Sequence, residues 1–188
     1  MEIDVGKGSI LIANPQGTDP NFMQTVVLIC EHSKRGTLGL ILNKTLGKKG
    51  QEIFVSSVNS QAKDKEIFFG GPVDTNNMFY LHGDFKNEAH NCVKICEGVY
   101  LGTNQGCFNE FMSRKNVSDN IFRLYLGCAC WSGGQLESEI EMKCWTVGTA
   151  TENMVFYPSP DNIWWNILRS ISNIDPEFPY DNAEPILN

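Results

Sequence analysis

Seven cysteines and three histidines are the side chains of this sequence best suited to act as nucleophiles or general bases. A thiol becomes a strong nucleophile when a nearby base ionises it, so a catalytic cysteine needs a partnered histidine. His82 ends the apolar run Met78–His82, but no spacing pairs it with one particular cysteine. A small hydrolase or redox enzyme that uses His82 or a cysteine is therefore one hypothesis. A hydrogen-bonded structural histidine is the simpler interpretation.

The spacing of the cysteines does not predict a metal site. Structural zinc sites use paired CxxC or CxxH knuckles, whereas the closest spacings here are Cys92-x3-Cys96 and Cys128-x-Cys130. The odd number of cysteines, and acids where a signal peptide would carry bases, favour a cytoplasmic protein with free thiols. We expect seven reduced thiols, no metal and no cofactor.

Cys128 and Cys130 test this expectation most directly. If residues 120–131 form a strand, both side chains point to one face, roughly 7 Å apart along the strand at ~3.3 Å per residue. A disulfide needs Cβ atoms about 3.5–4.5 Å apart, so we expect no bridge between this pair. A partner on a neighbouring strand is the alternative, and Cys144 is the natural candidate.

Two glycine-rich junctions could shape a binding site. In Gly70–Val73, proline fixes φ and glycine accepts a positive φ, as in a sharp turn between strands. In Trp131–Glu137, a strand runs through two glycines into a helix, so its backbone can approach another element or a ligand closely. Helix N-termini attract anions, yet Glu137 and Glu139 lie in the first turns and would repel a phosphate.

Together these junctions predict one cleft of apolar walls with few polar groups, suited to a small molecule or a protein partner. The candidate ligand-binding residues are Gly70, Gly71, Pro72, His82, Trp131, Gly134, Gln135 and Glu137. No residue is assigned as catalytic.

The charge balance argues against a nucleic-acid partner. Fifteen Lys and Arg residues face 22 Asp and Glu residues, for a net charge of −7. Nucleic-acid binders usually carry a basic face because phosphate neutralisation supplies most of the affinity. No apolar run reaches the ~18 residues of a membrane span. A transcriptional regulator that acts on DNA is kept as an alternative function.

Short apolar and alternating runs predict about eight strands with three or four helices. Helices are expected at 104–115, 135–143 and 161–171, a helical turn capped by Asp19 at 19–22, and a polar loop at 47–50. Residues 52–58 fit either a helix or a strand. Because the order lacks regular β-α-β alternation, it predicts an α+β fold, with a mixed sheet or partly closed barrel. Residues 1–172 form one predicted domain, and 173–188 form an acidic, proline-containing tail.

Several motifs follow one another in a specific order between Gly8 and Ile171. They are Gly8–Pro15, Asp19–Phe22, Thr25–His32, Gly39–Asn43, Gly70–Val73, Leu81-His82, and Trp131 with Gly134–Glu137. In this order the sequence resembles the AlgH/YqgE family of bacterial proteins. It departs from that family's pattern G-Y-A-G-W-G-P-G-Q-L-E, because Cys128 and Cys130 replace tyrosine and glycine.

The resemblance implies an α+β fold whose mostly antiparallel sheet is bent into a pseudo-barrel flanked by helices. The family is largely uncharacterised, some members are called transcriptional regulators, and no catalytic residues can be carried over. The function expected from residues and resemblance together is that of a cytosolic, non-enzymatic regulatory or ligand- and partner-binding protein.

Overall fold

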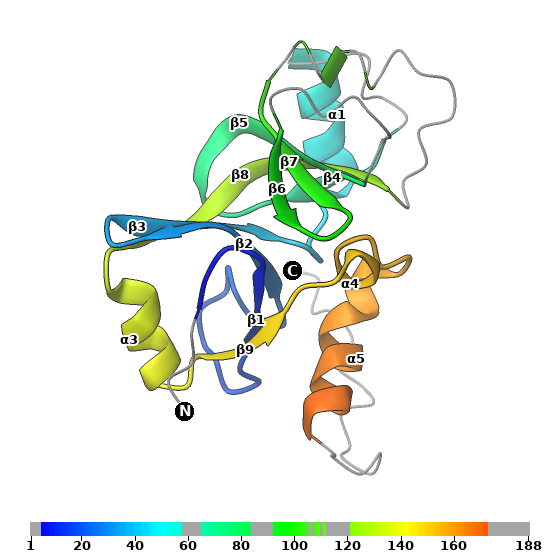
Figure 1. Cartoon of the computed structure of the whole chain (residues 1–188). Helices are drawn as coiled ribbons and strands as arrows, with labels where there is room; N and C mark the ends of the chain where they lie inside the picture. The colour runs from blue at the N-terminus through cyan, green and yellow to red at the C-terminus, as the bar shows by residue number, and fades with distance from the viewer. Residues whose placement is uncertain are drawn as a thin grey trace.

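The computed structural model describes residues 5–57, 65–83, 92–104, 106, 108, 109, 111 and 121–172. Its centre is a single curled sheet in the order β6-β7-β5-β8-β3-β2-β1-β9, with β4 added alongside β8 (Figure 1). Among the described residues, no helix is both long and apolar enough to cross a membrane. The predicted tail, 173–188, lies outside the described residues.

The described residues form nine strands, which are β1 Ser9–Ala13, β2 Val26–Ser33, β3 Gly36–Ile41, β4 Ile67–Phe69, β5 Val73–His82, β6 Val93–Cys96, β7 Val99–Gly102, β8 Phe122–Ser132 and β9 Trp145–Thr149. All pairings are antiparallel except that of β4 with β8. The long strand β8 joins the two halves of the sheet, since it pairs with β5 as far as Cys128 and with β3 from Ala129 onwards. The expected mixed, mostly antiparallel and bent sheet is confirmed.

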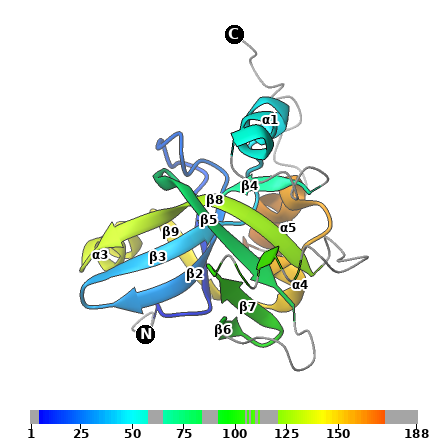
Figure 2. The ribbon, with the colours of Figure 1, turned by 90° about the horizontal axis from the view of Figure 1, so that it is seen from above.

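Within the described part of the chain, four helices with defined bounds accompany this sheet: α1 Gly47–Ser57, α3 Gln135–Glu141, α4 Glu152–Val155 and α5 Pro160–Ser172. Figure 2 shows α3 beside the end of β8 and α4 with α5 on the other side of the molecule. The loop predicted at residues 47–50 is wrong, because these residues form the first turn of α1. Gly47 takes a positive φ of 65°, so the glycines that suggested a loop mark the entry to a helix.

Both faces of the sheet are buried at β1 and at the first part of β2, which explains why Ile10–Ala13 and Val26–Cys30 are apolar at every position. Ile10 and Leu28 pack on the side of α4 and α5, where Trp164 and Ile167 complete the cluster. Their neighbours along the strands pack on the opposite face, towards Trp131, Leu136 and Trp145. The prediction of a buried central strand at 25–31 is confirmed.

The segment before β2 forms the predicted helical turn. Asp19 accepts hydrogen bonds from the amides of Asn21 at its carboxylate (2.8 Å) and of Met23 at its carbonyl (2.9 Å). Phe22 lies on this turn and packs against Trp131 and Trp145. The turn therefore brings residues 19–24 close to two different parts of the molecule.

Candidate functional site

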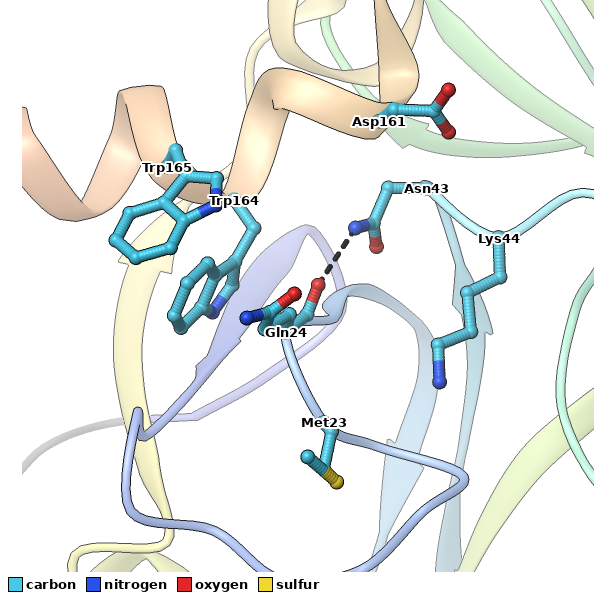
Figure 3. A pocket seen from close by; sticks show the side chains of 7 residues that line it. All are labelled: Met23, Gln24, Asn43, Lys44, Asp161, Trp164 and Trp165. Atoms are coloured by element: carbon cyan, nitrogen blue, oxygen red, sulfur yellow. Dashed lines mark hydrogen bonds between the residues drawn. The ribbon is translucent and has the colours of Figure 1, made fainter. Parts of the chain in front are cut away.

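A pocket of about 210 Å³ opens between the end of this turn, the chain that follows β3, and α5 (Figure 3). Its lining residues are Met23, Gln24, Asn43, Lys44, Asp161, Trp164 and Trp165. They combine two amides, an ammonium, a carboxylate and two indoles. At roughly 30 Å³ per water, the pocket has room for about seven waters, or one small polar molecule.

Gln24 occupies this pocket in a strained conformation. Its φ is 54°, in the left-handed region that non-glycine residues seldom adopt. The carboxamide of Asn43 fixes it, since Nδ2 donates to the Gln24 carbonyl (2.8 Å) while Oδ1 accepts from the Val26 amide (2.8 Å). Such strain costs about 1–3 kcal/mol and is concentrated at functional sites.

Lys44 brings a positive charge to the pocket. Its Nζ donates to the carbonyls of Pro20 and Asn21, each at 3.0 Å. An ammonium has three donors, so one more hydrogen bond is possible. Partial burial lowers the pKa of Lys44, and nearby Asp19 opposes this shift. An acceptor or anion in the pocket would therefore gain a charge-assisted hydrogen bond.

The first turns of α5 form the opposite wall. Trp164 is buried and donates its indole N–H to the Ala13 carbonyl (2.9 Å), which fixes the ring against β1. Trp165 packs edge-on against it, with ring centroids 4.6 Å apart. Asp161 stands at the start of the helix and is exposed. This wall offers an aromatic surface and a carboxylate, which suit a ligand with a donor or cationic group.

The sequence-predicted site residues lie elsewhere. Gly70 and Gly71 are buried where the chain crosses β8, and a Cβ on either would overlap backbone atoms of Gly127, Cys128 or Ala129. The amide of Gly70 donates to the Leu126 carbonyl (2.8 Å), and its carbonyl accepts from Ile41 (2.9 Å). Here the glycines let two backbones approach each other. Pro72, the next residue, is exposed.

His82 is fully buried among aromatic rings. Its ring stacks on Tyr100 with centroids 5.4 Å apart, and Phe111 lies at 4.7 Å. Nδ1 donates to the Gly83 carbonyl (2.8 Å), because a carbonyl can only accept. A side chain with 0% exposure cannot reach a substrate in this conformation, so the geometry favours the structural interpretation of His82.

The Trp131–Glu137 junction is held by a carboxylate that the sequence did not single out as a partner. Glu139 Oε2 accepts from the indoles of Trp131 (2.9 Å) and Trp145 (2.8 Å), and Oε1 accepts from Gln135 Nε2 (3.0 Å). Gln135 also accepts from the Ser132 amide (3.0 Å). These contacts fix α3 to β8 and β9.

The remaining predicted residues stand at the surface around this junction. Gly134 is exposed and takes a φ of 80° as the N-cap of α3, with open space around it. Glu137 Oε1 lies 3.6 Å from His32 Nε2, and His32 in turn bonds Thr37 (2.7 Å). The structure brings together Trp131, Gln135 and, through His32, Glu137. It places His82 in a separate core, and the shared cleft with Gly70–Val73 stays a prediction.

The sequence analysis did not predict this pocket, although two of the family motifs help to build its walls. The Asp19–Phe22 motif builds the turn before Gln24, and Asn43 ends the Gly39–Asn43 motif. A buried asparagine at the end of an apolar strand was the available signal, because a buried carboxamide must find partners. Nothing in the sequence indicated that α5 would lie opposite them.

Comparisons with known proteins agree with the fold. The model of the DUF179, AlgH-like family matches residues 10–175. UPF0301 proteins of Chlamydia muridarum and Chlamydia abortus are 33% and 36% identical to this chain, covering 88% of it and 86% of each relative. UPF0301 is also part of the name of a Chlorobium chlorochromatii relative, 34% identical over 165 residues.

Two solved structures share the architecture. Protein DIP2367 from Corynebacterium diphtheriae superposes with a TM-score of 0.74 at 23% identity, covering 90% of this chain and 89% of its own. The AlgH protein from Pseudomonas aeruginosa gives a TM-score of 0.71 at 25% identity, with the same coverage. The family match over most of the chain, the curated relatives and the shared architecture show that this chain belongs to the AlgH-like family.

Proposed function

We propose that this chain is a non-catalytic cytoplasmic binding protein whose pocket takes a small polar molecule of amino-acid size, and that it acts as a regulator. The observation that carries the proposal is Gln24, held at φ 54° by Asn43 on the wall of a charged and aromatic pocket. A strained residue persists only where its surroundings over-determine it, and ligand sites are common among such places. The cytoplasmic setting is supported by the odd number of cysteines.

The pocket chemistry defines the ligand class. Lys44 has a donor to spare for a carboxylate, while Asp161 and the indoles suit an ammonium or another donor. A zwitterionic α-amino acid carries both groups. The volume of about 210 Å³ lies below the 300–1,000 Å³ of sites for larger ligands, which favours a compact molecule.

The composition of the pocket supports binding without turnover. The alternative of a hydrolase or redox enzyme needs His82 or a cysteine, and neither is among the residues that line this pocket. Two of the three Lys44 donors are held by carbonyls, which leaves one for a ligand.

The test is thermal unfolding of the full chain with each of the twenty L-α-amino acids at millimolar concentration. A ligand at 100 times its Kd stabilises a protein by ~2.7 kcal/mol, so binding raises Tm. Tryptophan fluorescence provides a second readout, since Trp165 lines the pocket.

Charge-neutral variants locate the effect. Lys44→Met and Asp161→Asn should abolish the Tm increase. Matched controls are Lys94→Met, whose ammonium pairs with the exposed Glu97, and Glu141→Gln on the exposed part of α3. If no amino acid raises Tm, or if both pocket variants respond like their controls, the proposed ligand class is wrong.

A further inference from the structure

Two cysteine side chains touch near the end of β8. Cys128 Sγ lies 3.5 Å from Cys130 Sγ, although we expected about 7 Å between them. The prediction that both point to one face is confirmed, but the distance was wrong, because the side chains lean towards each other along the strand. The suggested partner Cys144 is also wrong: it precedes β9, which pairs with β1, whereas β8 is separated from β9 by three strands.

The surrounding backbone allows the two sulfur atoms to approach further. Gly127 takes a φ of 69° just before the pair, and β8 changes partner from β5 to β3 between Cys128 and Ala129. A disulfide has an S–S length of about 2.05 Å, so the sulfur atoms need to close by roughly 1.5 Å. Rotation about the Cα–Cβ bonds turns the sulfur atoms towards each other, and the strand must also bend at this irregular point to bring the Cβ atoms within about 3.5–4.5 Å.

The two thiols differ in exposure. Cys130 is exposed and Cys128 is buried, with its Sγ also 3.8 Å from the Val73 carbonyl. Burial, followed by the neighbouring Cys130 thiol, raises the pKa of Cys128 to about 12. An oxidant from solvent therefore meets Cys130 first, and Cys128 stays protonated beside it. The pair therefore differs in access to solvent, with Cys130 open to an oxidant and Cys128 placed beside it as a second thiol.

We propose that Cys128 and Cys130 are a peroxide-reactive dithiol, in which Cys130 is oxidised first and Cys128 then closes a reversible disulfide. The Cys130 thiolate attacks one oxygen of hydrogen peroxide, the O–O bond breaks, and a sulfenic acid forms at Cys130 with release of water after protonation. Cys128 then attacks the Cys130 sulfur, the S–O bond breaks, and the Cys128 thiol proton joins the departing hydroxyl to form a second water. In total, two thiols and one peroxide give one disulfide and two waters.

A tryptic digest isolates this pair. Cleavage after Arg123 and Lys143 yields the peptide 124–143, which contains Cys128 and Cys130 and no other cysteine. The next peptide, 144–169, contains only Cys144, an exposed thiol that serves as an internal control. The reduced full chain is treated with stoichiometric hydrogen peroxide, blocked with N-ethylmaleimide, digested and weighed.

The expected result is loss of both maleimide adducts from peptide 124–143 and a mass 2 Da below that of the dithiol, as one disulfide requires. Dithiothreitol should restore both adducts, and Cys144 should keep its adduct under the same conditions. Three results would overturn the proposal: two adducts retained, a bridge between peptide 124–143 and another peptide, or a sulfinic acid at Cys130.

Single variants test the two roles. In Cys128→Ala, Cys130 lacks a resolving thiol, so labelling of its sulfenic acid by dimedone should rise severalfold above that of the natural chain. Cys130→Ser should leave Cys128 unoxidised, because the buried thiol has lost its exposed partner. Cys130 is exposed, so this second variant is expected to fold. Equal dimedone labelling in Cys128→Ala and the natural chain, or oxidation of Cys128 in Cys130→Ser, would contradict the order of events.

Discussion

Two regions of this molecule place polar groups beside tryptophans, but they use those groups differently. The closed region contains Gly70, Gly71, Trp131, Glu139 and Trp145. The open region contains Gln24, Asn43, Lys44, Asp161 and Trp165. In the closed region, Glu139 receives three donors, and backbone fills the space beside the glycines. In the open region, Lys44 has a donor to spare and Asp161 is exposed beside a pocket.

The difference separates structural polar groups from groups that can bind. A buried polar group needs a partner within the protein, and once satisfied it has little to offer a ligand. Tryptophans beside polar residues cannot reveal which case applies, since both regions contain them. Mutations should distinguish the two, because substitutions in the closed region should cost stability and those in the open region should cost ligand binding.

The largest effect is expected for Gly71→Ala. The added Cβ would overlap the backbone of Cys128 and Ala129, and alanine is also strained at the φ of 151°. We expect the free energy of unfolding to fall by more than about 4 kcal/mol, measured by urea denaturation. Gly134→Ala is the control, with positive φ but open space, and should cost about 1 kcal/mol. Similar losses in both would mean that the crossing is not tightly packed.

Glu139→Ala should come next. It removes the acceptor of two indole N–H groups, and Trp131 and Trp145 are at least nine-tenths buried. Leaving buried donors unpaired should lower the free energy of unfolding by about 3 kcal/mol. Glu141→Ala, two residues along on the exposed part of α3, should change it by less than about 0.5 kcal/mol. If Glu139→Ala lowered the free energy of unfolding by less than about 1 kcal/mol, the contacts of Glu139 would add little to the fold, as expected of polar groups in the open region.

In the open region, Lys44→Met should cost only about 1 kcal/mol. The variant loses two hydrogen bonds to carbonyls at the partly exposed surface and keeps the aliphatic stem. Urea denaturation beside Lys94→Met, which should be near neutral, gives the comparison. A loss as large as that of Glu139→Ala would show that Lys44 belongs to the fold more than to a site.

The smallest effect, and of opposite sign, is expected for Gln24→Gly. Glycine accepts a φ of 54° without strain, so the free energy of unfolding should rise by about 0.5–1 kcal/mol. Amino-acid binding, measured as the Tm increase, should weaken at the same time. Gln24→Asn is the control for the side chain alone, because asparagine also tolerates a positive φ. A less stable Gln24→Gly would remove the argument from strain.

The sequence predicted the fold better than the site. Runs that alternate apolar and polar residues, and runs that are apolar at every position, located most strands. Asp19 correctly predicted a capped turn. The first turn of α1 was missed because glycines such as Gly47 and Gly50 are typical of loops. Helix α4 was missed because four residues are too few to show a helical period.

The site was harder because its parts are far apart in the sequence. Gln24 and Trp164 are 140 positions apart, and nothing local to either records that they share a pocket. Glycine pairs were easy to see, but a close approach to backbone and a close approach to a ligand have the same signature. Only the packing of β8 against Gly70 and Gly71 decides between them.

The turn at Asp19–Met23 lies between both regions, and this has a thermodynamic consequence. Phe22 packs on Trp131 and Trp145, while Met23 and Gln24 line the pocket. Ligand binding in the pocket and packing of Phe22 on the tryptophans involve the same short segment, so the two are linked. The coupling free energy is the same in either direction. A ligand that holds Gln24 in place should slow the amide hydrogen exchange of α3, and weakening the Phe22 contact should lower affinity in the pocket.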